Sequence, residues 1–217
     1  MDAQKVLSPA ELERLVSIRH PHQAQLFLVG RYLLRQRLAS RLNEDPARIP
    51  IRIGARGKPL LERSGWDFNI SHSGDLLALT IGNRGALGID LESRRLDPPR
   101  VHRLAHRYLN AAEQQWLTRS PDPEQDFRRL WTVKEAVLKA CGEGIANNLQ
   151  RVHWQPGAGY AMLDRQPYRL YQYALPRAWL TLAVEEGTDA EPTWLRLSDL
   201  PFGLEISGPQ PNLTRNP

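Results

Sequence analysis

Two acidic side chains near the middle of the chain are the strongest candidates for chemistry. Asp90 and Glu92 lie two residues apart in the alternating segment 87–92, Leu-Gly-Ile-Asp-Leu-Glu. In a β-strand this spacing places both side chains on one face. Adjacent carboxylates repel each other unless a cation or a proton lies between them, and Mg²⁺ prefers oxygen ligands of this kind. Taken alone, the pair is more often a solvated strand face, because acidic residues are usually exposed.

A third acid lies on a predicted helix that covers about residues 124–140. Trp131, Glu135 and Lys139 follow one another at intervals of four residues, so they share one face of that helix. Such a Glu–Lys spacing is common on helix surfaces, where it is worth only about 0.3–0.5 kcal/mol. Without a partner elsewhere in the chain, the pair indicates no function.

Two further segments could bind phosphate. Asn69-Ile70-Ser71-His72-Ser73 ends a predicted strand, and a histidine flanked by serines can donate hydrogen bonds to phosphate oxygens. In Gly57-Lys58-Pro59, the glycine allows the backbone to approach a ligand closely, the lysine provides a mobile charge, and the proline makes the chain rigid. Either segment could equally form an ordinary turn. Neither is a phosphate loop of the Gly-x-x-x-x-Gly-Lys type.

The elements that must position these residues can be predicted from capping signals and periodicity. Ser8, Pro9 and Glu11 mark a helix start, and Asn110 could cap a second short helix that ends near Leu117. A longer helix follows the first one, and alternating or apolar runs separated by Gly, Asp and Asn indicate strands. We expect helices over about 23–43 and 124–140, and strands near 51–53, 68–72, 76–81, 87–92, 149–154, 168–174, 178–185 and 193–197. Helices followed by strands occur twice, which suggests a duplicated α+β architecture.

Composition limits the classes of protein that fit. The chain has 217 residues, of which 41% are hydrophobic and 24% charged, so it can bury a core and is not a disordered chain. It has one cysteine, no apolar run long enough for a membrane span and no secretory signal at the start, so we expect a cytoplasmic protein. The net charge of +5 favours acidic partners, such as nucleic acid, phosphorylated cofactors or acidic proteins.

Taken together and in order, the four segments resemble a known family. They follow the pattern of the Sfp-type phosphopantetheinyl transferases: Gly-Lys-Pro, then Asn-hydrophobic-Ser-His-Ser, then Gly-Ile/Val-Asp-x-Glu, then an aromatic-Ser/Thr-x-Lys-Glu-Ala/Ser-x-x-Lys helix. These stand here as Gly57–Pro59, Asn69–Ser73, Gly88–Glu92 and Trp131–Lys139. The resemblance spans roughly residues 8–185, and every defining position is filled.

The resemblance implies a fold and an activity. The fold is α+β, with two similar lobes in one chain that form a pseudo-dimer. We expect an N-terminal lobe at 1–97 with a truncated first strand, a C-terminal lobe at 98–198 and a loose polar tail at 199–217. The implied activity is Mg²⁺-dependent transfer of the 4′-phosphopantetheine arm of coenzyme A to a serine of an apo acyl or peptidyl carrier protein, with release of 3′,5′-ADP. We expect a monomer that binds neither nucleic acid nor a membrane.

By motif match, the resemblance also implies roles for individual residues. Asp90, Glu92 and Glu135 would hold Mg²⁺, and Glu135 would also be the general base for the carrier serine. His72 and Ser71 would contact the phosphates, and Lys139 would neutralise charge that develops on the diphosphate. The implied contacts to the rest of coenzyme A are Lys58 and Pro59 at the adenosine end, Arg14 at the 3′-phosphate and Glu113 near the cofactor arm or the metal.

Some positions depart from the family pattern. The family often has an arginine near Gln25 or Leu26, but Leu26 here lies on the apolar stripe of its helix. Glu11 stands at one of two basic positions of the first helix, which leaves Arg14 at the other. We therefore expect weak binding of coenzyme A.

Three alternatives remain at this stage. A nucleic-acid-binding protein would explain the basic charge, but Arg31/Arg35 and Arg37/Arg41 point in roughly opposite directions on their helix and form no single patch. Another Mg²⁺-dependent phosphotransferase or phosphodiesterase acting on coenzyme A could use the same carboxylates. A third alternative is an inactive relative that only binds coenzyme A or the carrier. The kind of carrier and the choice of Mg²⁺ or Mn²⁺ stay open.

Overall fold

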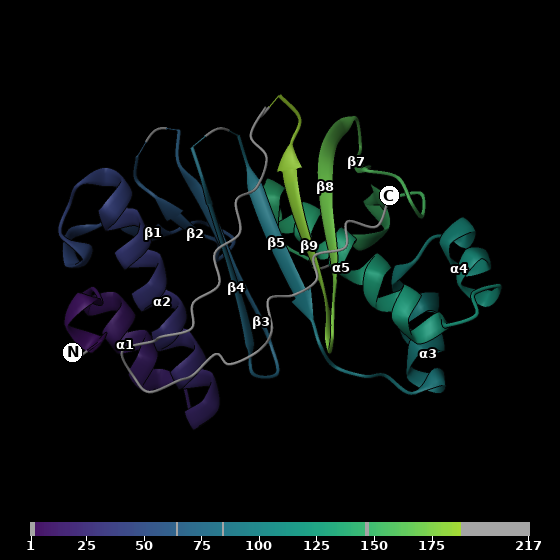
Figure 1. Cartoon of the computed structure of the whole chain (residues 1–217), viewed down its shortest axis with the longest axis horizontal. Coiled ribbons are helices and arrows are strands. Elements are labelled where there is room, and N and C mark those ends of the chain that lie inside the picture. The colour runs from purple at the N-terminus through teal and green to yellow at the C-terminus, as the bar shows by residue number, and fades with distance from the viewer. Residues whose placement is uncertain (1–2, 64, 84, 146–147, 188–217) are drawn as a thin grey trace.

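The structure, a computed structural model, combines helices and strands and describes residues 3–63, 65–83, 85–145 and 148–187. Two long helices, α2 and α5, lie on opposite sides of the strands, as Figure 1 shows. The helical elements are η1 (Ala3–Val6), α1 (Pro9–Ser17), α2 (Pro21–Leu42), η2 (Pro46–Arg48), α3 (Pro98–Tyr108), α4 (Ala111–Thr118), α5 (Pro123–Cys141) and η3 (Leu149–Arg151). The strands are β1 (Ile51–Ile53), β2 (Pro59–Leu61), β3 (Asp67–Ser73), β4 (Leu76–Gly82), β5 (Leu87–Glu92), β6 (Val152–His153), β7 (Tyr160–Leu163), β8 (Gln166–Leu175) and β9 (Ala178–Glu185).

Helix α1 begins with the capping box that the sequence predicts. The Ser8 side chain accepts from the backbone N–H of Glu11, and the Glu11 carboxylate accepts from the backbone N–H of Ser8. Glu11 is buried, and its Oε2 lies 2.7 Å from Nε of the fully buried Arg35 on α2. Arg31 Nε lies 3.5 Å from the other carboxylate oxygen. These ion pairs hold α1 against α2, so Arg31 and Arg35 serve a contact within the protein.

The β3–β4 hairpin provides the surface on which α2 packs. Phe68 of β3 lies in one core cluster with Leu34 and Leu38 of α2, and all three are fully buried. Where the helix crosses the hairpin, Gly30 lies close to Leu77 and Ile70. This packing accounts for the apolar stripe of α2, and the expected core position of Leu26 is confirmed by its burial.

The larger sheet has five antiparallel strands in the order β5-β9-β8-β7-β6. Asp90 of β5 lies opposite Thr181 of β9 in this register. Strand β5 therefore shares its backbone hydrogen bonds with the C-terminal strands, although it precedes the lobe boundary that we expected at residue 97. Strands β3 and β4 form a separate two-stranded sheet, as do β1 and β2.

Helix α5 covers one face of the five-stranded sheet. It is capped by Asp122 at its start and ends at Gly142, whose φ of 75° is left-handed and suits glycine. Its apolar side includes Leu130, Val133 and Val137, which are fully buried. The predicted bounds of this helix were therefore nearly correct.

Some elements differ from the sequence prediction. Helix α3 was not predicted; Asp97 caps it, and Pro98 and Pro99 occupy its first turn. Strand β7 was also missed, and the strand expected at 149–154 consists of η3 followed by the two-residue β6. The expected strand at 193–197 and the tail at 199–217 lie outside the described residues. Over the ranges that the structure describes, we find no helix both long and apolar enough to cross a membrane.

Candidate active site

The candidate site forms where α5 lies directly against β5. Gly88 makes this possible, because a Cβ atom at that position would overlap the backbone of Ala136 and Ala140. The contact brings one turn of α5, with Glu135 and Lys139, next to the acidic end of β5. Close helix–strand packing through a glycine therefore explains why Gly88 stands two residues before Asp90.

Asp90 is the centre of this group. Its side chain is buried, and its Oδ1 accepts hydrogen bonds from Ser71 Oγ at 2.9 Å and from Lys139 Nζ at 2.5 Å. Lys139 Nζ also lies 3.1 Å from Ser71 Oγ and 3.7 Å from Glu135 Oε2. Three elements, β3, β5 and α5, thus meet at one carboxylate. Four of the residues singled out in the sequence, Asp90, Glu135, Lys139 and Ser71, therefore lie together in the structure.

Glu92 is held by a different set of partners. Its Oε1 accepts from Ser73 Oγ at 2.7 Å and from the backbone N–H of Arg94 at 2.8 Å, and its Oε2 lies 2.9 Å from Arg94 Nη2. Burial alone would raise the pKa of Glu92, but these hydrogen bonds outweigh it and lower the pKa below its usual range. Glu92 therefore stays charged beside the other two acids.

Glu135 has the most strongly shifted acidity of the three. Burial is the main reason that its pKa rises to about 7, and the charges of Asp90 and Glu92 and a hydrogen bond with Asp90 raise it further. Lys139 opposes the shift. A carboxyl group that titrates near neutral pH can accept or release a proton under physiological conditions, which is typical of a general base.

His72 follows Ser71 near the end of β3, and its side chain is exposed. Its pKa is lowered, first by partial burial and then by the charges of Lys139 and His22, while Asp90 has the opposite effect. Its imidazole is therefore mainly neutral at neutral pH. A neutral imidazole can still donate one hydrogen bond to a phosphate oxygen.

Asp90, Glu92 and Glu135 are the candidate ligands for a divalent cation. In the described part of the chain, no three His, Cys, Asp or Glu side chains converge closely enough to form a ready-made metal site. Asp90 is neutralised by Lys139, and Glu92 is turned toward Arg94. The donor chemistry nevertheless fits Mg²⁺, because all three candidates are carboxylates and their mutual repulsion raises the pKa of Glu135.

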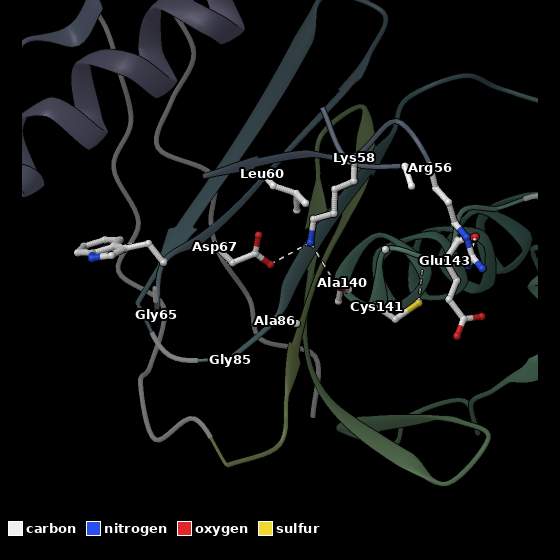
Figure 2. Close-up of a pocket in the computed structure, with 14 residues that line it drawn as sticks. Arg56, Lys58, Leu60, Gly65, Asp67, Gly85, Ala86, Ala140, Cys141 and Glu143 are labelled. Carbon is white, nitrogen blue, oxygen red and sulfur yellow. Dashed lines mark hydrogen bonds and ion pairs between the residues drawn. The ribbon is translucent and has the colours of Figure 1, made fainter. Parts of the chain in front are cut away.

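A cavity of about 690 Å³ opens near the end of α5 (Figure 2). Its lining includes Lys58, Trp66, Asp67, Ala86 and Cys141. Lys58 Nζ lies 2.9 Å from Asp67 Oδ2 and 3.2 Å from the carbonyl oxygen of Ala140, so it joins β3 to α5. Pro59 begins β2 beside this wall but is not among the residues that line the cavity.

The first lysine of the α5 motif has a structural role. Lys134 is fully buried, and its Nζ lies 2.8 Å from Glu113 Oε1 and donates to the carbonyl oxygens of Leu149 and Val152. The other oxygen of Glu113 accepts from the N–H of Asn110 at the start of α4. Our expectation for Glu113 needs correction, because its carboxylate pairs with Lys134 and caps α4.

The candidate residues near the N-terminus are not among those that line the cavity. Arg14 is exposed on α1, where its Nη1 lies 3.5 Å from Ser17 Oγ, and it does not line the cavity. Glu11, which stands at a basic position of the family pattern, is part of the α1–α2 contact. Its acidic character therefore has a packing explanation.

Two residues of the site were missed from the sequence. Asp67 binds Lys58 and also accepts from the N–H of Leu87, and Arg94 binds Glu92. The position of Asp67 gave a signal that could have been used. Asp67 lies two residues before Asn69 on β3, so it continues the strand face of a candidate, whereas Arg94 follows Glu92 beyond the end of β5.

Comparison with known proteins identifies the family. The sequence model of the 4′-phosphopantetheinyl transferase superfamily matches residues 86–181, and that of the 4′-phosphopantetheinyl transferase N-terminal region matches residues 1–82. The Synechocystis sp. protein slr0495, named as a 4′-phosphopantetheinyl transferase, is 32% identical over 83% of this chain and 80% of its own length. This chain belongs to the 4′-phosphopantetheinyl transferase superfamily.

Other members of the superfamily are also similar. The 4′-phosphopantetheinyl transferase HetI of Nostoc sp. is 36% identical over 67% of this chain and 63% of its own length. A phosphopantetheinyl transferase of Thraustochytrium sp. is 29% identical over 92% of this chain and 78% of its own length. Membership of this transferase superfamily confirms the prediction made from the four motifs, and the Sfp-type subgroup stays a prediction.

Proposed function

We propose that this protein transfers the 4′-phosphopantetheine arm of coenzyme A to a serine of an apo acyl or peptidyl carrier protein and releases 3′,5′-ADP. The observation that carries this proposal is the meeting of Glu135 and Lys139 with Asp90, in a chain of this superfamily. The serine hydroxyl would attack the β-phosphorus of coenzyme A. In this reaction the protein must orient two substrates and balance phosphate charge.

The three acids are our candidates for holding Mg²⁺. Asp90, Glu92 and Glu135 supply carboxylate oxygens from β5 and α5, and the cation would neutralise the diphosphate and stabilise the leaving group. Since Lys139 and Arg94 already bind two of these carboxylates, these cations share the balance of charge at the site. Mn²⁺ could serve in the same place.

Glu135 is our candidate for the general base. With a pKa raised to about 7, its carboxyl group is partly ionised at neutral pH and can accept the proton of the attacking serine. Lys139 Nζ lies between Asp90 and Glu135, where it can donate to a phosphate oxygen as negative charge moves toward 3′,5′-ADP. His72 can donate a hydrogen bond from the exposed side, and Ser71 orients Asp90 and Lys139.

The cavity is our candidate for the adenosine end of coenzyme A. Lys58 lines it and Pro59 adjoins it, as the family pattern implies. Arg14 stays our candidate for the 3′-phosphate, and we expect weak binding of coenzyme A because Leu26 and Glu11 replace basic residues. We also propose the two-lobe pseudo-dimer and a monomeric state, with no requirement for nucleic acid or a membrane.

The decisive experiment follows both products. A panel of apo acyl and peptidyl carrier proteins would be incubated with the protein, coenzyme A and Mg²⁺, and carrier mass and 3′,5′-ADP would be measured together. We expect a carrier that is heavier by one phosphopantetheine arm and an equal amount of 3′,5′-ADP. Release of 3′,5′-ADP without carrier modification would favour a phosphodiesterase. Binding of coenzyme A with no product would indicate an inactive relative.

A further inference from the structure

Strands β3 and β5 are joined by side chains instead of by a backbone ladder. Every second residue of β5 bonds to β9, which leaves the other N–H groups directed at β3. Each of these N–H groups, and that of Ser93, donates a hydrogen bond to a β3 side chain that lies twenty positions earlier in the chain. The acceptors and distances are Asp67 Oδ2 to Leu87 N (3.0 Å), Asn69 Oδ1 to Ile89 N (3.0 Å), Ser71 Oγ to Leu91 N (3.2 Å) and Ser73 Oγ to Ser93 N (2.9 Å). We call these four bonds the β3–β5 seam.

The seam connects every part of the candidate site. At one end, Asp67 lines the cavity and binds Lys58. At the other end, Ser71 and Ser73 also donate to Asp90 and Glu92. The seam thus fixes how far β3, which carries His72, can slide along the acids of β5. A shift by one residue would turn all four acceptors to the other face of β3.

The acceptors also differ in length along the seam. In Asp67 and Asn69 the acceptor oxygen is one bond farther from the backbone than in the two serines, yet the four distances are alike. A serine at position 69 would therefore carry its acceptor oxygen one bond closer to its own backbone than Asn69 does.

We propose that Asn69 is a positioning residue: its bond to Ile89 N–H sets the register and spacing of β3 against β5, and so holds Ser71 and Ser73 against Asp90 and Glu92. Asn69 is buried, and its acceptor oxygen binds the residue directly before Asp90. It is the one seam residue among the four that neither lines the cavity nor bonds to an acid or a lysine in the contacts above. The catalytic consequence of this role rests on the proposed transfer reaction.

Three variants separate this role from ordinary packing. Asn69→Leu keeps the size of the side chain and removes the acceptor, Asn69→Asp keeps an acceptor in the same place, and Asn69→Ser keeps an acceptor whose side chain is one bond shorter. Thr80→Val is the matched control, because Thr80 is paired opposite Asn69 on β4 and makes no bond of the seam. All variants would first be checked for cooperative unfolding.

The first readout is amide exchange of Ile89 by NMR, which needs no activity. We expect Asn69→Leu and Asn69→Ser to speed exchange at Ile89 by about fivefold or more, the equivalent of one lost hydrogen bond. Exchange at Leu91 should change less, and the Asp and Thr80→Val variants should resemble the wild type. Unchanged exchange at Ile89 in both the Leu and the Ser variant would overturn the proposal.

The second readout is steady-state transfer to an apo carrier. We expect kcat to fall about 10- to 100-fold in the Leu and Ser variants, with a smaller change in the KM for the carrier, because misplacement by about 1 Å has effects of this size. Rescue by Asn69→Asp is part of the expectation, and equal losses in the Asp and Leu variants would overturn it. If the wild type modified no carrier, the proposed function would fail while the exchange result would still decide the seam.

Discussion

Lys139 Nζ lies 2.5 Å from Asp90 Oδ1 and 3.7 Å from Glu135 Oε2, so one ammonium group joins a helix to the acidic end of a strand. The two carboxylates are 45 positions apart in the sequence. Because Lys139 opposes the rise in the pKa of Glu135, it also controls how much of the candidate base is ionised. The first prediction follows from this arrangement.

Replacing Lys139 by Met should impair transfer and change its pH dependence. We expect kcat/KM to fall about 10²- to 10³-fold, as is usual when a preorganised donor to a reacting group is removed. The acidic limb of the pH profile should move to higher pH, because the pKa of Glu135 rises further without Lys139. The matched control is Arg52→Met, which removes an exposed pair with Glu62. A normal pH profile in Lys139→Met would contradict this role.

Glu135 should make the stability of the protein depend on pH when divalent cations are chelated. Its pKa in the folded protein, about 7, lies above the ordinary value of 4.5, so the protonated form favours folding. This contribution is complete below pH 4.5 and is lost as the pH rises through about 7. Between pH 5 and 8, the wild type should lose on the order of 2 kcal/mol more unfolding free energy than Glu135→Gln, measured with urea.

Addition of Mg²⁺ completes that experiment. At pH 8 a bound cation would offset the repulsion among Asp90, Glu92 and Glu135, so Mg²⁺ should stabilise the wild type more than Glu135→Gln. Parallel pH profiles for the two proteins in chelator would contradict the raised pKa of Glu135, and equal stabilisation by Mg²⁺ would contradict the proposed metal ligands.

The contact between β5 and α5 predicts a severe effect at Gly88. A methyl group at this position would overlap the backbone of Ala136 and Ala140, and neither can move without shifting α5. Gly88→Ala should therefore destabilise the protein by about 1–3 kcal/mol or more, and should reduce turnover of the folded fraction by separating Glu135 from Asp90. Gly159→Ala is the control, because no atom lies within 4 Å of a Cβ atom there. Thermal unfolding and activity per folded molecule would test both parts.

Lys134 and Lys139 belong to one motif but should behave differently. Lys134→Met leaves the buried carboxylate of Glu113 without its partner, which typically costs about 3–5 kcal/mol. The double variant Lys134→Met/Glu113→Gln should recover much of this loss in urea unfolding. A single variant that unfolds like the wild type, or a double variant no more stable than the single one, would show that the pair does not hold α4 to α5.

Local signals explain which elements could be predicted from the sequence. The starts of α1 and α4 were found because capping boxes lie within four residues, and β5 was found because apolar and acidic residues alternate. Helix α3 was missed because prolines can either end a helix or begin one. Here Asp97 caps the helix, and the prolines that follow it begin the first turn. Strand β7 was missed because its four residues, Tyr-Ala-Met-Leu, do not alternate between apolar and polar side chains.

The candidate site, too, could be predicted from the sequence only in part. That Asp90 and Glu92 share a face follows from strand geometry alone, as does the shared helix face of Glu135 and Lys139. The family resemblance brought these pairs together before the structure did. The partners of Glu113 and the seam of Asn69 could not be predicted, because those contacts depend on how α4, α5, β3 and β5 pack in space.

The central claim is that Glu135 and its neighbours move the arm of coenzyme A to a carrier serine. The most direct measurement is intact-protein mass spectrometry of an apo carrier after incubation with coenzyme A, Mg²⁺ and either wild-type or Glu135→Gln protein. We predict that the wild type adds one phosphopantetheine arm, that a carrier with its serine replaced by alanine gains nothing, and that the variant is at least about 100-fold slower. Equal rates for the two proteins, or no mass gain on any carrier with the folded wild type, would contradict the account.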